Sequence, residues 1–184
     1  MSVGRLILAL SVAASFFIGV PAAEAQLQFS AEPRAGVSFP TGDLSSEGAE
    51  AGLTLGAEGM VTFRRNMTGY LSLNRHGFSC DSDCQANLGS SPRSTGLGLG
   101  LKYVFPSPPD ALIWGRGGVL AHRLSTSQDS GDRNLGFEVG AGIDMPVGER
   151  LYLVPHLGFL SHDAGGDTRA SWFSFGVGAH YHFH

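Results

Sequence analysis

From Phe173 onward, every second residue of the chain is apolar, and the residues between are glycine, serine or histidine. Successive side chains of an extended strand point to opposite faces, whereas a helix, with a period of about 3.6 residues, would mix the two sets. The sequence therefore predicts a C-terminal strand with one wholly apolar face. The residues of that face are Phe173, Phe175, Val177, Ala179, Tyr181 and Phe183.

Seven earlier segments alternate in the same way. They span residues 27–39, 51–63, 67–76, 96–105, 111–123, 135–145 and 151–159. Short turns join some of them, and longer polar loops, residues 43–50, 77–93, 125–133 and 161–169, join the others. An even number of strands of about 9–11 residues, joined in this way, is typical of outer-membrane barrels. We predict an all-β fold, an eight-stranded antiparallel up-and-down transmembrane β-barrel.

Two prolines, Pro33 and Pro155, lie inside these segments. Each removes one backbone donor from a ladder, and proline within sheets is found at edges or bulges. A closed barrel has no edge, but a local bulge can absorb the loss of a single donor.

Glycine dominates the second face of the strands, and the chain has 27 glycines in all. Glycine covers no surface and weakens a strand, so it makes a poor wall toward water. Inside a narrow eight-stranded barrel it leaves the space that larger side chains need. The apolar face is therefore predicted to meet lipid. The alternative is a soluble exported β-barrel that binds a small apolar ligand in its interior.

Residues 1–25 have the composition of a secretory signal peptide. Arg5 precedes an apolar run over residues 6–18, and Ala23 and Ala25 place small residues at the two positions that the peptidase reads. We expect Sec-type export, cleavage near Ala25 and a barrel domain over residues 26–184 of the bacterial outer membrane. An uncleaved membrane anchor is the alternative, although the apolar run is shorter than the roughly 20 residues of a spanning helix.

The chain has two cysteines, Cys80 and Cys84, both in the 77–93 loop. An oxidising compartment favours a small disulfide between them, with two free thiols as the alternative. Two cysteines without further ligands make a poor zinc site.

Charged residues and histidines on the predicted inward face suggest an ion network that plugs the lumen. Eight strands enclose too little space for a wide pore. Removing one partner of such a network is expected to cost about 3–5 kcal/mol. The predicted members are Glu32, Arg34, Glu58, Lys102, Arg116, Glu138, Asp144, His156, His180 and His182.

The net charge of −4 and the absence of a basic stripe argue against a nucleic-acid partner. Outer-membrane lipid and lipopolysaccharide are the expected partners of a barrel that we expect to be monomeric. Four arginines near the outer strand ends are candidates for contacts with lipopolysaccharide phosphates. They are Arg75, Arg93, Arg123 and Arg169.

Catalytic and metal sites were weighed against simpler explanations. His180, His182 and His184 share one strand face, but neighbours on that face are roughly 7 Å apart, so chelation would need a ligand from another strand. Ser79 with His76, or Ser161 with His162 and Asp163, supplies the residue types of a lipid A hydrolase. Loop serines and lumen histidines explain the same residues. We expect no catalysis, no cofactor and no metal.

The signal peptide, the end of the first segment (Gly36-Val37-Ser38-Phe39-Pro40-Thr41-Gly42-Asp43-Leu44) and the last strand of alternating aromatics resemble those of a known family. It is the outer-membrane β-barrel domain family, which includes opacity-type and outer membrane protein A-like small barrels. The resemblance covers nearly all of the chain after the signal peptide. It implies a structural, adhesive or resistance role without shared catalytic residues.

The resemblance also implies that the outer-membrane assembly machinery reads the C-terminal strand, which usually ends in an aromatic residue. Here a final histidine, His184, follows that aromatic residue. The residues implied are Phe173, Phe175, Val177, Tyr181 and Phe183.

Overall fold

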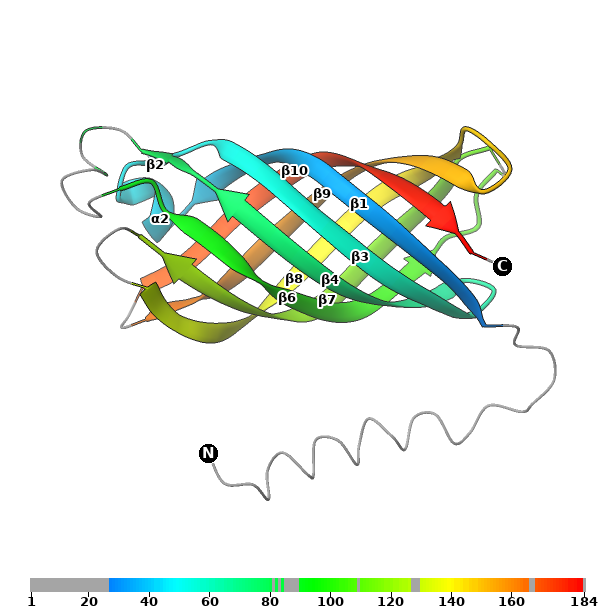
Figure 1. Cartoon of the computed structure of the whole chain (residues 1–184), viewed down its shortest axis with the longest axis horizontal. Coiled ribbons are helices and arrows are strands. Elements are labelled where there is room, and N and C mark those ends of the chain that lie inside the picture. Colours follow the sequence, from blue (N-terminus) through cyan, green and yellow to red (C-terminus); the bar gives the residue numbers. More distant parts are fainter. Residues whose placement is uncertain are drawn as a thin grey trace, which may run out of the picture.

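The computed structural model describes residues 27–80, 82, 84, 90–108, 110–126, 130–165 and 168–183. The predicted signal peptide lies outside these residues. Eight strands form a closed barrel, with both ends of the described chain at the same end of the barrel (Figure 1). The predicted fold class is confirmed. No helix within the described ranges is long and apolar enough to cross a bilayer.

Neighbouring strands are antiparallel, and the order around the barrel is β1-β10-β9-β8-β7-β6-β4-β3. The first and last strands close it, with Ala35 opposite Val177. The strands are β1 (Gln28–Thr41), β3 (Gly52–Arg64), β4 (Met67–Gly77), β6 (Arg93–Val104), β7 (Leu112–Ser125), β8 (Ser130–Pro146), β9 (Leu151–Gly165) and β10 (Thr168–His182).

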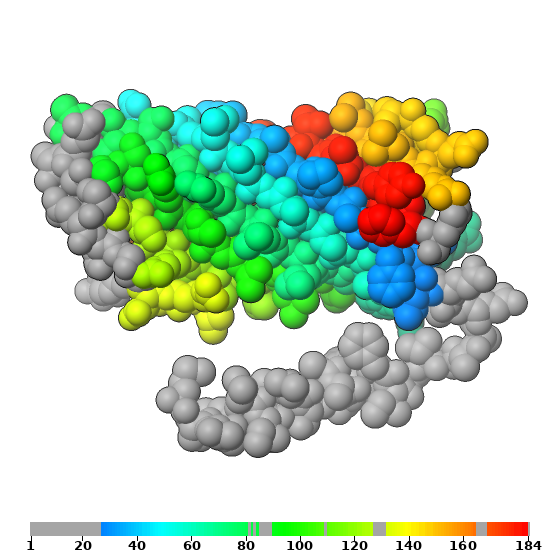
Figure 2. Space-filling view, in the orientation of Figure 1, coloured from blue at the N-terminus to red at the C-terminus, as the bar shows by residue number. Residues whose placement is uncertain are grey.

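The apolar face of the strands points outward. Phe173 and Phe175 are 45% and 52% exposed, and Leu53 is 73% exposed, whereas Glu32, Glu58 and other charged residues are almost fully buried. The outward side chains of neighbouring strands cover the side of the barrel in oblique bands (Figure 2). A soluble barrel would bury the apolar face instead, so the soluble alternative is wrong.

Both prolines lie in regular strands, and neither needs a bulge. Pro33 pairs with Ala57, and Pro155 pairs with Val177, without a register shift at either position. Each proline lacks one donor, and the pairs on both sides of it hold the register. The irregular positions are at strand ends instead, between Thr62 and Arg64, for example.

The outer loops are shorter than the sequence suggested. β8 begins at Ser130, β9 continues to Gly165, and β10 starts at Thr168, so most of the predicted 161–169 loop is strand. The predicted 43–50 loop holds the short helix α2 (Asp43–Ser46) and strand β2 (Ala49–Glu50). β2 pairs with β5 (Ser79–Cys80) in a small second sheet. These pieces lie at the end of the barrel opposite the start of β1 and the end of β10 (Figure 1).

Candidate functional site in the barrel lumen

Two arginines hold three carboxylates together in the middle of the lumen. Arg34 Nε lies 2.5 Å from Glu32 Oε1, and Arg34 Nη2 lies 2.8 Å from Glu58 Oε1. Arg116 Nη1 lies 2.7 Å from Glu58 Oε2, and its Nη2 lies 3.3 Å from Glu138 Oε2. Five of the ten sequence-predicted lumen residues thus form one ion network. Each of these side chains is at most 8% exposed.

Tyr70 of β4 completes this layer. Its hydroxyl donates to Glu138 Oε1 at 2.7 Å, and the Arg116 guanidinium lies 5.1 Å from its ring centre. Glycines make room for the ring, because a Cβ on Gly100 or Gly118 would lie 2.4 or 2.5 Å from the Tyr70 hydroxyl oxygen. Alternation placed Tyr70 on the inward face, but no sequence signal links it to Glu138 on β8.

A second cluster lies nearer the inner end. Lys102 Nζ donates to both carboxylate oxygens of Asp144, at 3.1 and 2.8 Å. Trp114 Nε1 donates to Asp144 Oδ1 at 2.6 Å, and the Lys102 ammonium lies 4.5 Å from the centre of the Trp114 ring. His180 Nδ1 is 3.4 Å from Asp144 Oδ2. Alternation also placed Trp114 on the inward face, but no sequence signal links it to Asp144 on β8.

The other two predicted lumen residues are His156 and His182. His156 Nδ1 lies 3.2 Å from the Val154 carbonyl oxygen. The His182 ring packs on His180 at 4.4 Å between centroids, closer than the roughly 7 Å spacing of neighbours on a strand face, because the rings lean together. Within the described residues, no group of three or more His, Cys, Asp or Glu side chains is arranged to hold a metal ion. His184 lies outside those residues.

A layer of histidines that was not predicted from the sequence lies toward the outer end. His76, His122 and His162 surround Trp172, with ring centroids 4.9, 6.2 and 5.5 Å from it. Serine hydroxyls bind the rings: Ser94 Oγ lies 2.9 Å from His122 Nδ1 and 3.2 Å from His162 Nε2. All three histidines occupy inward positions of the alternating pattern, which was a usable signal, but His76 and His162 were considered only as candidates for a lipid A hydrolase.

These contacts also bear on the lipid A hydrolase alternative. His76 Nδ1 lies 2.9 Å from both Ser38 Oγ and Thr54 Oγ1, inside the lumen and not next to Ser79. His162 is fully buried with Ser94 as its hydroxyl partner. Both candidate histidines thus face the lumen, away from the lipid interface where that chemistry would occur.

An apolar cluster lies at the outer end of the barrel, above the histidines. It consists of the buried residues Leu44, Ala49, Phe78, Leu120, Leu160, Ala170 and Trp172. α2 and β2 contribute Leu44 and Ala49, so the small outer elements fold inward as a cap. The Phe78 ring meets the Trp172 ring edge-on at 5.5 Å.

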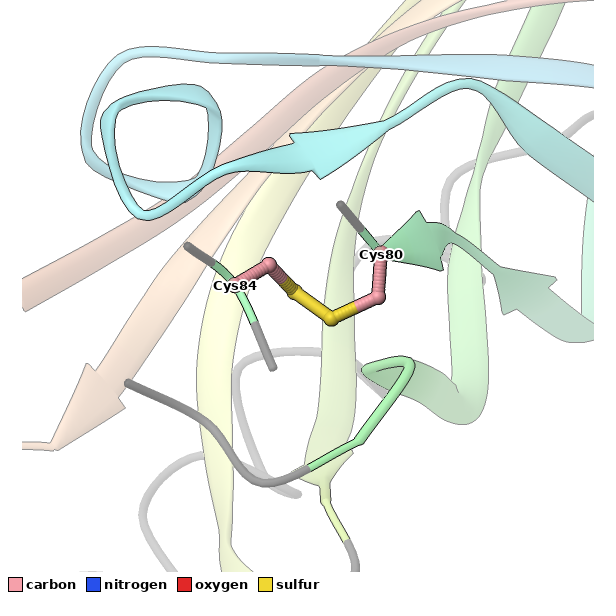
Figure 3. The surroundings of a disulfide bond; sticks show 2 residues. All are labelled: Cys80 and Cys84. Carbon is pink, nitrogen blue, oxygen red and sulfur yellow. A yellow bond between two sulfur atoms is a disulfide. The ribbon is translucent and has the colours of Figure 1, made fainter. Parts of the chain in front are cut away.

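The disulfide lies in this cap. Cys80 of β5 and Cys84 are bonded, as Figure 3 shows, next to β2 and α2. Cys84 is fully buried. The bond closes a loop of sequence separation four directly after Phe78, so it restrains the segment that delivers this ring to the apolar cluster.

The four candidate arginines are exposed and lie at the outer ends of their strands. Thr95 pairs with Arg75 on one side and Arg123 on the other, and Arg123 pairs with Arg133. Arg133 is also exposed. It was missed because the sequence predicted a loop over residues 125–133, whereas Arg133 lies in β8. Cross-strand pairing therefore brings Arg75, Arg123 and Arg133 into one row around the rim. Two further candidates, Arg93 and Arg169, lie at the same end.

A family model for the outer membrane protein beta-barrel domain matches residues 8–183. Three solved barrels illustrate the likeness in fold. Neisserial surface protein A has a TM-score of 0.63 at 12% identity, covering 84% of this chain and 97% of that one. OprG from Pseudomonas aeruginosa has a TM-score of 0.55 at 13% identity, covering 88% and 97%.

The third is Ail of Yersinia pestis, solved in complex with the heparin analogue sucrose octasulfate, with a TM-score of 0.51 at 13% identity, covering 85% and 98%. No protein of curated function matches the sequence.

Proposed function

Because this chain belongs to the outer membrane protein β-barrel domain family, it is a protein of the bacterial outer membrane, and we propose that it serves there as a non-enzymatic structural barrel with a closed lumen and an outer rim that binds lipopolysaccharide. The observation that carries the proposal is the filling of the lumen. The apolar cap, the histidine layer and the ion network lie one below another across its width. Such a barrel stabilises or marks the surface rather than passing solutes.

Conductance in planar lipid bilayers tests the closed lumen. We expect no steady channel current from the folded protein, because charged side chains of both signs occupy the middle of the lumen and bind one another. A fourfold variant, Arg34→Ala with Glu58→Ala, Arg116→Ala and Glu138→Ala, removes most of that layer and is expected to conduct. Heat-modifiability in detergent gels shows that both proteins are folded. Stable single-channel currents from the native barrel would contradict the proposal.

The rim arginines support the lipopolysaccharide contact. Guanidinium groups bind phosphates bidentately, and lipid A phosphates lie at the height of the outer strand ends. Ail, which shares the fold, was solved with a sulfated polyanion. This rim carries Arg75, Arg93, Arg123, Arg133 and Arg169.

Co-purification of lipopolysaccharide with the barrel measures that contact. Changing all five rim arginines to glutamine is expected to lower the bound amount several-fold at low salt. The matched control changes the exposed inner-end arginines Arg64 and Arg150 to glutamine, and it is expected to leave binding unchanged. Equal loss in both variants, or none in either, would remove the rim from the proposal.

The remaining parts of the proposal concern biogenesis. Residues 1–25 direct Sec-type export and are cleaved near Ala25. The assembly machinery then reads the aromatic residues of β10, whose outward side chains Phe173, Phe175, Val177 and Tyr181, with Phe183 after the strand, are all exposed. The product is a monomer. Mass measurement of the purified protein and its mobility in native gels test the cleavage site and the monomer.

A further inference from the structure

The inner end of the lumen opens into a cavity of about 580 Å³. It lies below the ion network, between the inner ends of the strands and the β3–β4 and β6–β7 turns. Its volume falls in the range of small-molecule sites, roughly 300–1,000 Å³. Its wall includes Arg65, Lys102, Asp144, Tyr152, His180 and His182.

The wall of this cavity is cationic. Lys102 and Arg65 carry positive charge, and among its lining residues Asp144 is the one carboxylate. That carboxylate is already occupied, because Lys102 Nζ binds both oxygens and Trp114 Nε1 binds one of them. An ammonium has three donors, so the two contacts with Asp144 leave one for a ligand. The cavity therefore presents donors and positive charge.

His180 is the second, independent observation. Its side chain is 5% exposed and lines the cavity. Neither ring nitrogen has a hydrogen-bond partner among the described residues, and the 3.4 Å approach of Nδ1 to Asp144 Oδ2 does not meet hydrogen-bond geometry. Buried polar groups are nearly always hydrogen-bonded, so an unpaired imidazole at a cavity wall indicates a missing partner.

We propose that this inner cavity is a binding site for a phosphate-bearing anion, with Lys102 and His180 as its principal donors and Arg65 at its mouth. An imidazole carries one N–H when neutral and two when protonated, so His180 and the adjacent His182 donate in either state. The Tyr152 ring packs against both imidazoles, at 5.9 and 5.3 Å between centroids, and holds them in place.

A transition-metal site is the competing occupant, because two histidines on alternate positions of a strand are common ligands. The third ligand would be Asp144, but the Lys102 ammonium already lies 2.8 Å from its Oδ2. A divalent cation would have to displace that ammonium. The arrangement therefore fits an anion better than a cation.

Trp114 supplies a local reporter of binding. It contacts both Lys102 and Asp144, while the second tryptophan of the chain, Trp172, lies in the outer cap. In a Trp172→Phe background, tryptophan emission reports the inner cluster alone. Titration of the detergent-folded barrel with pyrophosphate or inorganic phosphate at low salt is expected to shift that emission saturably. The converse Trp114→Phe protein is expected to show no shift.

Two variants distinguish pyrophosphate binding at the inner cavity from binding elsewhere on the barrel. His180→Gln with His182→Gln is expected to weaken pyrophosphate binding at least tenfold. His156→Gln is the matched control, because this histidine lies in the lumen but does not line the inner cavity. It is expected to leave the dissociation constant unchanged. Heat-modifiability confirms that each variant is folded.

Nanodiscs distinguish the two sources of the phosphate group. If the occupant is a lipid headgroup of the inner leaflet, Trp114 emission changes with phosphatidylglycerol content without added pyrophosphate. If it is a free solute, the emission changes only on addition of pyrophosphate, and either result supports the anion site.

Three outcomes overturn the proposal. In the first, a 10-fold excess of zinc shifts the emission while pyrophosphate does not. In the second, pyrophosphate binds equally well to the His180→Gln, His182→Gln protein, and in the third no titration produces a shift.

Discussion

The two halves of the lumen are filled by different chemistry. The outer half is packed with Leu120, Leu160, Trp172 and the other cap residues, above a layer of buried histidines. The inner half is filled by ion pairs and ends in an open, cationic cavity. Apolar packing contributes stability roughly in proportion to buried area, whereas buried ion pairs gain little over apolar replacements but are costly to break. We infer that the cap stabilises the barrel, and that the ion network fixes the positions of its side chains.

The largest effect is expected where a buried charge loses its partner. Arg34→Met leaves Glu32 without its arginine and takes one of two from Glu58. We expect a loss of about 3–5 kcal/mol in the free energy of unfolding. Urea titration of the barrel in lipid vesicles, followed by tryptophan fluorescence, measures it.

The matched control for that change is the double variant Arg34→Met with Glu32→Gln. It removes the charge that the single variant leaves unpaired, so its loss is expected to be clearly smaller. Equal losses in the two proteins would mean that the arginine acts by packing, and the contrast between the two halves of the lumen would fail.

A smaller loss is expected in the cap. Leu120→Ala removes a side chain that is 1% exposed and leaves a cavity in the apolar cluster, at a cost of about 3 kcal/mol. Leu99→Ala, on the lipid face of the adjacent strand, is the control. Lipid chains fill the space it vacates, so only the transfer free energy is lost. If both variants lose the same amount in urea titration, the cap is not packed like a protein core.

Strand faces could be predicted from the sequence because the two-residue period is local. Tyr70, Trp114 and the charged residues were all assigned to the inward face, and they lie there. Their partners could not be predicted. Glu58 binds Arg34 and Arg116, which are 24 and 58 positions away, and this choice depends on the tilt and stagger of the closed barrel.

The outer histidine layer was missed for a different reason. Residues near position 161 are polar, so the sequence indicated a loop, yet β9 continues to Gly165. Pairing with β10 and burial against the cap keep this stretch extended where its own side chains give no strand signal. His162 therefore lies within the lumen, and the rim arginine Arg133 lies in a strand.

The lumen glycines allow a test of how tightly the ion network is packed. A Cβ on Gly118 would lie 2.5 Å from the Tyr70 hydroxyl oxygen and 2.6 Å from the Leu99 carbonyl oxygen. Gly118→Ala is therefore expected to cost about 1–3 kcal/mol by overpacking. On the outward face, a Cβ on Gly59 meets nothing within 4 Å, so Gly59→Ala is expected to be neutral or slightly stabilising. Thermal unfolding in detergent compares them, and a neutral Gly118→Ala would show that the network has room to shift.

The smallest global effect is expected from the disulfide, and it decides whether the two halves of the lumen unfold separately. Replacing Cys80 and Cys84 by serine frees a loop of sequence separation four, for which chain entropy gives a loss of about 2 kcal/mol at most. The loop delivers Phe78 to the cap, so amide hydrogen exchange is expected to speed up at Leu44, Phe78 and Trp172. Exchange at Lys102 and Asp144, in the inner cluster, is expected to stay the same.

Reductant added to the native protein serves as a control, because it should give the same pattern without a change of sequence. Faster exchange at both ends would mean that the cap and the inner cluster open together. The continuous strands would then couple the two ends, although different side chains fill the two halves of the lumen.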